Sequence, residues 1–245
     1  MIRFFRNIRR ELATENKVAS YLRYAIGEIL LVVIGILIAL QVNNWNENRK
    51  DKNKETLYLT NIREEIMGDS LYYERGWFKS YPRKLEGILS AKNYVMGNYN
   101  IKDTVAFLNS ASYGGKYSIG NFGINSRTYE ELVSTGNLSL ISDPDLKNRI
   151  VSYYLSANFI NNYSNDLRSG YAAYFNSFKV FNPKEPTHVN KLEIPRILKK
   201  MQSDEFYSIV NKELTYTYSI NGVLEAQKSR ANQLSKVIEQ YLKSK

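Results

Sequence analysis

Glu28 is the residue with the clearest chemical potential, because this carboxylate lies within a long apolar segment. A carboxylate is costly in hydrocarbon, so such residues usually face protein, water or a basic partner and are often involved in proton or ion movement. Glu28 could therefore carry protons or meet a base on a neighbouring helix. Alternatively, it lies about one turn inside the membrane interface, reaches the headgroups and pairs with Arg23 or Lys17.

The other side chains offer little catalytic chemistry. The chain has one histidine, His188, and no cysteine, whereas a structural zinc site needs about four such ligands. His188 lies in a proline-rich stretch without a surrounding motif. Glu64–Glu65 and Glu130–Glu131 are adjacent pairs, and adjacent residues on a helix point in different directions. We therefore expect no enzymatic activity, no metal and no cofactor.

Glu28 belongs to a segment of membrane-spanning length, residues 24–45, with the sequence YAIGEILLVVIGILIALQVNNW. Tyr24 and Trp45 bracket it, and a helix between them would be about 31 Å long. A bilayer core is about 30 Å thick, and aromatic residues are typical of both membrane interfaces. The sequence predicts one transmembrane helix at 24–45, with Tyr24 and Trp45 as its interfacial anchors.

One face of this helix differs from the others. Spacings of i, i+4, i+7 and i+11 place four residues on one stripe, namely Glu28, Val32, Gly35 and Ala39. Gly35 and Ala39 form a small-xxx-small pair, which lets two helix backbones approach closely. The stripe predicts packing against a second copy of the chain or against a partner membrane protein.

Residues 1–23 predict the orientation of the helix. This short arm is basic, with six basic and two acidic residues, which favours retention in the cytoplasm. No small-residue cleavage site follows the apolar segment, so we expect an uncleaved anchor. The arm has the pattern of a helix lying on the lipid bilayer, although a plain topology signal is the alternative. The residues concerned are Phe4, Phe5, Arg6, Arg9 and Arg10.

Residues 46–245 show helical signals nearly throughout, with apolar residues at helical spacing and few breaks. Long helices joined by short connections predict an all-α fold in which this exported domain is an antiparallel helical bundle. The chain is thus expected to comprise an arm at 1–23, a transmembrane helix at 24–45 and a bundle at 46–245.

The sequence also predicts several helix boundaries. Tyr81–Pro82 should break or kink the first long helix. Four glycines and three aromatic residues predict a loop at 111–125. Thr128 and Glu131 have the spacing of a capping box.

Further boundaries follow along the chain. Asp143–Pro144 predicts a helix start, with an apolar face continuing to about Phe178. We expect a linker at 181–190, a short helix at 191–202 interrupted by Pro195, and a last helix capped by Ser203 or Asp204.

The chain is rich in tyrosine, with 20 residues, and carries a net charge of +10. Many tyrosines fall on apolar helix faces, which favours core packing, but tyrosine is also common at protein interfaces. Tyr154, Tyr163 and Tyr171 are candidates for a subunit contact or a small-molecule groove. The positive charge suits anionic headgroups, glycans or proteins. No basic-aromatic motif suggests nucleic acid.

Two blocks of the sequence are similar to a known family. YLRYAIGEILLVVIGILIALQVNNWNE at residues 21–47 and TYEELVSTGNLSLISDPDLKNRIVSYY at residues 128–154 resemble a bacterial family of single-pass membrane proteins catalogued as a domain of unknown function. The resemblance implies an anchor followed by an exported helical region, and it assigns no catalytic or binding residue. Together with the charge pattern, it favours the bacterial inner membrane, with a cytoplasmic N-terminus and a periplasmic C-terminal domain.

Three functions are compatible with these features. The leading hypothesis is a non-enzymatic, membrane-anchored interaction or scaffold protein, either oligomeric or an accessory subunit of an envelope complex. The second is an exported domain that senses a small ligand and signals through a partner. The third is a subunit of an ion- or proton-driven membrane machine that uses Glu28.

Overall fold

The computed structural model describes residues 18–119, 122–178 and 191–245. Every regular element in these ranges is a helix, which confirms the all-α prediction. The predicted membrane-surface arm up to Arg10 and the predicted linker with His188 lie outside the described residues. The chain divides into two compact units, Met1–Glu55 and Thr56–Lys245, so the second begins ten residues after the predicted start of the exported domain.

The first unit consists, in its described part, of the beginning of helix α2 (Val18–Tyr73). Its aliphatic side chains are exposed along the whole apolar stretch, from Leu22 to Val42. The most apolar window of this helix is 0% buried within the chain, whereas the core helix of a globular domain would be covered. By length and composition this helix is able to cross a membrane, in agreement with the predicted span.

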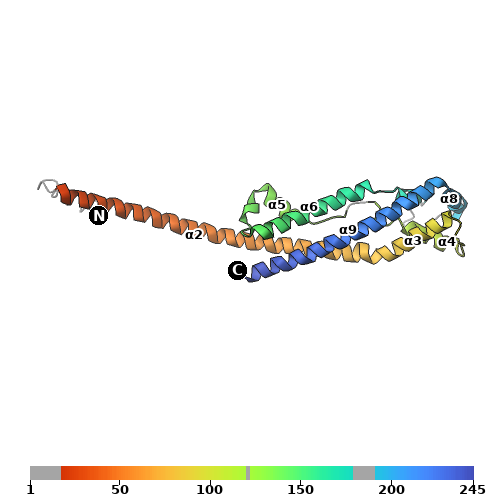
Figure 1. Cartoon of the computed structure of the whole chain (residues 1–245), viewed down its shortest axis with the longest axis horizontal. Coiled ribbons are helices and arrows are strands. Elements are labelled where there is room, and N and C mark those ends of the chain that lie inside the picture. The colour runs from red at the N-terminus through yellow and green to blue at the C-terminus, as the bar shows by residue number, and fades with distance from the viewer. Residues whose placement is uncertain (1–17, 120–121, 179–190) are drawn as a thin grey trace. The chain divides into compact units, whose positions relative to one another are not determined.

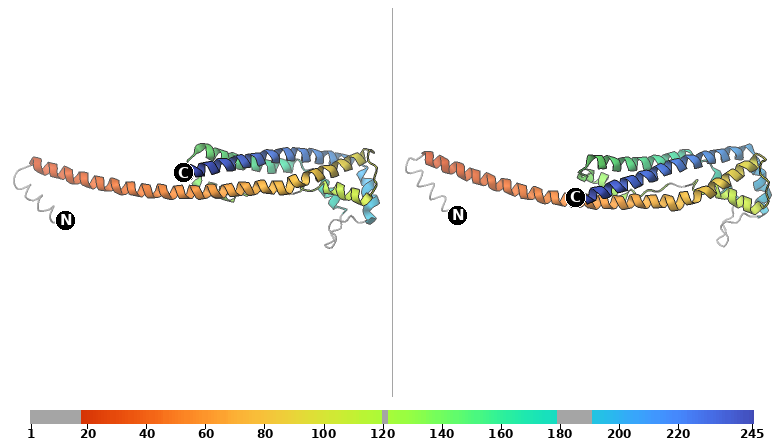
Figure 2. Two further views of the ribbon diagram at one scale, coloured as in Figure 1. Left: turned by 90° about the horizontal axis from the view of Figure 1, so that it is seen from below. Right: turned by 60° about the horizontal axis from the view of Figure 1, so that its bottom comes forward.

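The second unit is a bundle of antiparallel helices (Figures 1 and 2). After the end of α2, its elements in chain order are η1 (Glu74–Phe78), α3 (Lys79–Val95), α4 (Thr104–Tyr113), α5 (Arg127–Ser134), η2 (Asn137–Leu140), α6 (Pro144–Asp166), α7 (Tyr171–Asn176), η3 (Lys191–Glu193), α8 (Ile194–Met201) and α9 (Asp204–Lys243). The long helix α9 packs against both α3 and α6 and runs antiparallel to each.

A π-helical turn, η1, separates α2 from α3. The backbone N–H of Lys79 donates to the carbonyl of Glu74, five residues earlier. Pro82 explains this turn, because proline has no N–H and its ring presses on the carbonyl four residues before it, that of Phe78. The wider turn absorbs this strain. The break predicted at Tyr81–Pro82 is thus found just upstream, and the helix continues through Pro82.

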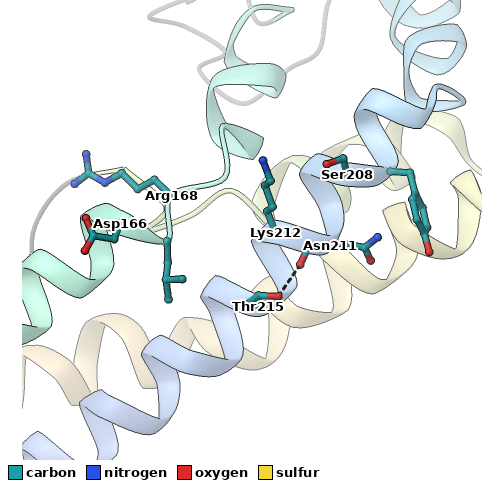
Figure 3. A pocket seen from close by; sticks show the side chains of 8 residues that line it. Asp166, Arg168, Ser208, Asn211, Lys212 and Thr215 are labelled. Carbon is teal, nitrogen blue, oxygen red and sulfur yellow. Dashed lines mark hydrogen bonds between the residues drawn. The ribbon is translucent and has the colours of Figure 1, made fainter.

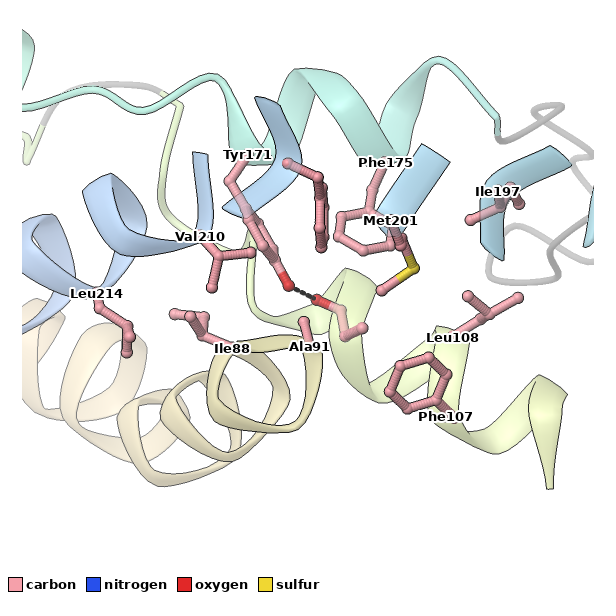
Figure 4. Close-up of a cluster of buried hydrophobic side chains, with 12 residues drawn as sticks. Ile88, Ala91, Phe107, Leu108, Tyr171, Phe175, Ile197, Met201, Val210 and Leu214 are labelled. Atoms are coloured by element: carbon pink, nitrogen blue, oxygen red, sulfur yellow. Dashed lines mark hydrogen bonds between the residues drawn. The ribbon is translucent and has the colours of Figure 1, made fainter. Parts of the chain in front are cut away.

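The core of the bundle consists of three hydrophobic clusters, and α9 supplies three buried residues to each. The first cluster, where α9 meets α3, α4, α7 and α8, is shown in Figure 4. The second cluster joins α2, α6 and α9, and the third surrounds Trp77 of η1. The contributions of α9 are Phe206, Val210 and Leu214, then Tyr216, Ile220 and Leu224, and finally Ala231, Leu234 and Ile238.

Helices α3 and α4 approach each other closely at two glycines. A Cβ atom on Gly87 would lie 2.1 Å from the carbonyl oxygen of Ser110, and one on Gly114 would lie 2.7 Å from Cγ1 of Ile88. Neither position has room for a larger side chain. The lack of a side chain at Gly87 and Gly114 therefore permits the contact between these two helices.

Some predicted boundaries are confirmed. Asp143 caps α6 by accepting hydrogen bonds from the N–H groups of Asp145 and Leu146. Ser203 caps α9 by accepting from Phe206 N at 3.2 Å. Both caps satisfy N–H groups that would otherwise lack partners at a helix start.

Other predicted boundaries are wrong. Helix α4 extends to Tyr113, into the predicted loop, because Ala111 packs in the first cluster. Helix α6 ends at Asp166 rather than near Phe178, since the chain turns at Gly170, whose φ of +76° favours glycine. Pro195 lies in the first turn of α8 instead of interrupting it, where its missing N–H costs nothing.

Candidate functional site

A buried ion pair lies inside the second unit. Lys84 of α3 and Glu213 of α9 are both 0% exposed. The Lys84 ammonium donates to the carbonyl oxygen of Gly114 at 2.5 Å, to Oγ of Ser118 at 2.9 Å and to Oε1 of Glu213. These three bonds use all three donors of the ammonium group.

Glu213 is equally well satisfied. Its Oε1 also accepts a hydrogen bond from the hydroxyl of Ser118, and its Oε2 accepts one from Ser169. Ser169 in turn accepts from the N–H of Tyr171 at 3.0 Å. The Lys84–Glu213 cluster therefore joins α3, the end of α4, the following loop, the α6–α7 connection and α9.

Two aromatic rings enclose the ammonium group. The ring centres of Trp77 and Tyr216 lie 6.0 Å and 5.7 Å from Nζ of Lys84. Each ring is fixed by a hydrogen bond: Trp77 Nε1 donates to Oδ1 of Asn221 at 2.9 Å, and the Tyr216 hydroxyl donates to the carbonyl oxygen of Tyr117 at 2.8 Å. Tyr117 has φ +61°, which is unusual for a residue with a side chain. A π-helical turn and a strained backbone both often mark functional sites.

Burial determines the electrostatics of this cluster. It lowers the pKa of Lys84, and the adjacent Glu213 opposes that shift. It also raises the pKa of Tyr216 to about 12, against a hydrogen bond with Ser164 that lowers it. A buried charge is tolerated only when it is paired and hydrogen-bonded, and both members of this pair meet that condition.

The polar groups of this cluster bond to one another and to the backbone of the bundle. Ser118 beside Lys84 has the composition of a Ser–Lys dyad, but Ser118 is 5% exposed and its hydroxyl donates to Glu213. A hollow of about 540 Å³ lies next to the cluster, and Arg168, Ser208 and Lys212 contribute to its lining, whereas Lys84 and Ser118 do not (Figure 3). Among the described residues, no group of side chains is suited to hold a metal ion.

A second polar cluster holds α5 against α2. Oε1 of Glu65 accepts from the N–H of Thr128 at 3.1 Å and from its hydroxyl at 2.7 Å. One turn further along α2, Asp69 accepts from Asn125 N at 2.9 Å and from the Tyr153 hydroxyl at 3.0 Å. The N-cap residue of α5 makes no side-chain cap bond. Glu65 therefore accepts a hydrogen bond from an N–H of the first turn of α5, which the N-cap residue does not do.

This contact corrects the predicted capping box. Helix α5 begins at Arg127, and Ser126 is its N-cap. Thr128 lies in the first turn and uses its hydroxyl for Glu65 instead of for capping. Sequence spacing alone could not show that a carboxylate of α2, 63 residues earlier in the chain, binds the same N–H.

The stability of the bundle should depend on the ionisation of Asp69. Burial raises the pKa of Asp69 to about 6 from 3.8, while its bonds to Asn125 and Tyr153 oppose the shift. A raised pKa means that the folded state binds the proton more tightly. The contribution of this proton binding to the free energy of unfolding is therefore complete below pH 3.8 and is lost as the pH rises through about 6.

Asp69→Asn keeps the shape of the side chain and removes its ionisable carboxyl group. Between pH 5 and pH 7 we expect the wild type to lose about 1 kcal/mol of unfolding free energy relative to the variant. Urea unfolding in detergent micelles can be followed by Trp77 fluorescence in a Trp45→Phe background, since the chain has two tryptophans. Parallel pH profiles for both proteins would contradict this assignment.

Of the predicted membrane stripe, Val32, Gly35 and Ala39 are exposed in the first unit, whereas Glu28 is partly buried. Val32 is 55% exposed, and no atom lies within 4 Å of a Cβ built on Gly35. At the end of the apolar segment, Trp45 is 63% exposed, with the guanidinium of Arg49 5.4 Å from its ring centre. The stripe of Glu28, Val32, Gly35 and Ala39 and the anchoring roles of Tyr24 and Trp45 remain predictions.

The predicted interface tyrosines need correction. Tyr154 and Tyr171 are 1% and 0% exposed, so they belong to the core and are not available to a partner. Tyr154 stacks on Tyr129 with ring centres 4.3 Å apart, and the hydroxyl of Tyr171 donates to the carbonyl oxygen of Ala111 at 2.8 Å. Tyr163 is partly buried against the third cluster. Core packing, the other interpretation of the tyrosines, holds for Tyr154 and Tyr171.

Sequence reasoning missed Lys84 and Glu213, although a signal was present. Lys84 precedes Ile88 by four residues, and Glu213 follows Val210 by three, so both occupy the apolar face of their helices. One positive and one negative charge on two otherwise apolar faces indicate a buried pair. The partner serines carry no such signal, because a serine in a loop is ordinary.

Over the described residues, fold and site together define a helical protein with one membrane-length helix and a bundle that contains internal polar clusters. The chain belongs to DUF6090, a family of unknown function, whose model matches residues 28–167. This confirms that the chain belongs to a family of unknown function, as the resemblance indicated. Comparison with curated proteins and with solved structures found no match. The matched range includes Lys84 and Ser118, whereas Ser169 and Glu213 lie beyond it.

Proposed function

We propose that this protein is a non-enzymatic, membrane-anchored interaction protein whose transmembrane helix packs against a second copy or a partner membrane protein. The stripe of Glu28, Val32, Gly35 and Ala39 is the contact surface. The helix crosses the bacterial inner membrane once, with the N-terminus in the cytoplasm and the helical bundle in the periplasm. The assembly is either an oligomeric scaffold or an envelope complex of which this chain is an accessory subunit.

The observation that carries this proposal is the uncovered apolar helix with one face of small and polar residues. Within the described residues its apolar window is 0% buried, which supports lipid or another protein as its surroundings. One stripe of the helix carries a carboxylate and a small-xxx-small pair, whereas the rest of its surface is apolar and suits hydrocarbon. In the bundle, the polar groups of the Lys84–Glu213 cluster are already hydrogen-bonded to one another, which favours a scaffold over an enzyme.

Gly35→Leu should reduce the size of the detergent-extracted assembly, because a leucine on the stripe keeps the two helix backbones apart. The matched control is Gly27→Leu. Gly27 lies in the same helix, also has no atom within 4 Å of a built Cβ, and points about 100° away from Glu28. Light scattering of the purified complexes measures the change. Equal sizes for the wild type and both variants would refute packing through this stripe.

Because the chain has no cysteine, introduced cysteines can distinguish self-association from binding to a different protein. Single cysteines introduced at Gly35 or Ala39 should form disulfide-linked dimers in native membranes if two copies meet along the stripe, whereas Ile34→Cys, off the stripe, should not. Cross-linking to a protein of different mass would identify an accessory subunit instead.

A further inference from the structure

A second hollow, of about 610 Å³, lies between α6 and α9 and is separate from the ion-pair cluster. Its size is in the range of small-molecule sites, which are typically about 300–1,000 Å³. Arg149 of α6 and Arg230 of α9 both line it, together with the polar side chains of Asn148, Ser152 and Gln233. Donor groups from two helices thus surround one space.

The lining of the hollow carries more positive than negative charge, with two arginines and one aspartate. Within the described ranges, neither Arg149 nor Arg230 has an ion pair among the salt bridges found. Asp145 is the single acidic residue of the lining. It lies four residues before Arg149 on α6, in the first turn, where the helix dipole stabilises its charge.

A chain of hydrogen bonds that begins at the lining of the hollow holds Arg230. One of its guanidinium nitrogens donates to the hydroxyl of Ser156 at 2.5 Å, and that hydroxyl donates to Oε1 of Gln227 at 2.8 Å. Gln227 is 0% exposed and donates to the carbonyl oxygen of Tyr153 at 3.3 Å. This relay uses one of the five N–H groups of the Arg230 guanidinium. A pre-positioned guanidinium loses less entropy on binding.

We propose that this hollow binds an oxyanion, a phosphate or carboxylate group, between Arg149 and Arg230. The planar guanidinium fork matches both groups with paired hydrogen bonds, and the hydroxyl of Ser152 and the amide of Gln233 add further donors. The group belongs either to a free metabolite or to a lipid headgroup, since both present the same chemistry. The site is independent of how the transmembrane helix packs.

The test uses the full chain in non-ionic micelles. Inorganic phosphate is titrated by ³¹P line broadening and succinate by saturation transfer, at constant ionic strength set with chloride. A second arm adds dihexanoyl phosphatidate to the micelles, with dihexanoyl phosphatidylcholine, a zwitterion of zero net charge, as its comparison. Arg149→Gln and Arg230→Gln are compared with Lys236→Gln, which removes the same charge from an exposed position of α9 outside the hollow.

We expect each arginine variant to bind the anion at least tenfold more weakly, a loss of about 1.4 kcal/mol, and Lys236→Gln to bind it as the wild type does. Binding of phosphate or succinate identifies a soluble ligand, and binding of phosphatidate alone identifies a lipid headgroup. No binding in either arm would overturn the proposal. Equal weakening of binding by all three variants would also overturn it, because that result indicates only a general effect of net charge.

Discussion

Lys84→Met should lower the free energy of unfolding by about 3–5 kcal/mol, the largest effect that we expect from a single substitution. Methionine fills similar space but leaves the carboxylate of Glu213 buried without its cation. Ser118 and Ser169 would still donate to that carboxylate, yet two hydroxyl groups do not neutralise a charge. Urea unfolding followed by Trp77 fluorescence in the Trp45→Phe background measures the loss.

A double variant separates the cost of an unpaired charge from the value of the pair. Lys84→Met combined with Glu213→Leu removes both charges, and we expect most of the lost stability to return, because two apolar residues need no compensation. Lys79→Met, at an exposed position of the same helix, should change stability by less than about 0.5 kcal/mol. A double variant as unstable as Lys84→Met would show that the charges themselves stabilise the fold.

Gly87→Ala should have the second large effect on stability. Its sign should be opposite to that of the same substitution at Gly222. At Gly87 the added methyl group would lie 2.1 Å from the backbone oxygen of Ser110, so α3 and α4 must separate. We expect a loss of about 3 kcal/mol. Gly222 lies within α9 with no atom within 4 Å of a built Cβ, and Gly222→Ala should stabilise by about 0.5–1 kcal/mol.

Thermal unfolding of the two alanine variants and the wild type provides the measurement. The opposite signs are the informative result, because helix propensity favours alanine equally at both positions. If Gly87→Ala unfolds at or above the wild-type temperature, the close contact between α3 and α4 described here is incorrect.

Local signals were sufficient for much of the fold. The apolar run at 24–45, the Asp143–Pro144 start and the cap at Ser203 each depend on a few neighbouring residues, and each is found in the expected element. Helix existence was predictable because spacing at 3.6 residues per turn is a property of the segment alone.

Features that depend on distant residues were not predictable in the same way. The loop expected at 111–125 is helical as far as Tyr113 because Ala111 contacts a core that α7, α8 and α9 complete. The role of Thr128 depends on Glu65 of α2. Lys84 and Glu213 each stand out locally as a charge on an apolar helix face, but their pairing was not predictable, since they are 129 residues apart and meet only when α3 packs against α9.

The position of α9 in the chain has a consequence for the order of folding. Each of the three core clusters needs residues from α9, yet α9 is translated after all the helices that it covers. The ion pair between Arg63 and Glu239 likewise joins residues 176 apart. Such long-range contacts form slowly. The bundle therefore completes its fold only after α9 has been synthesised, and until then its apolar helix faces are open to aggregation or to chaperones.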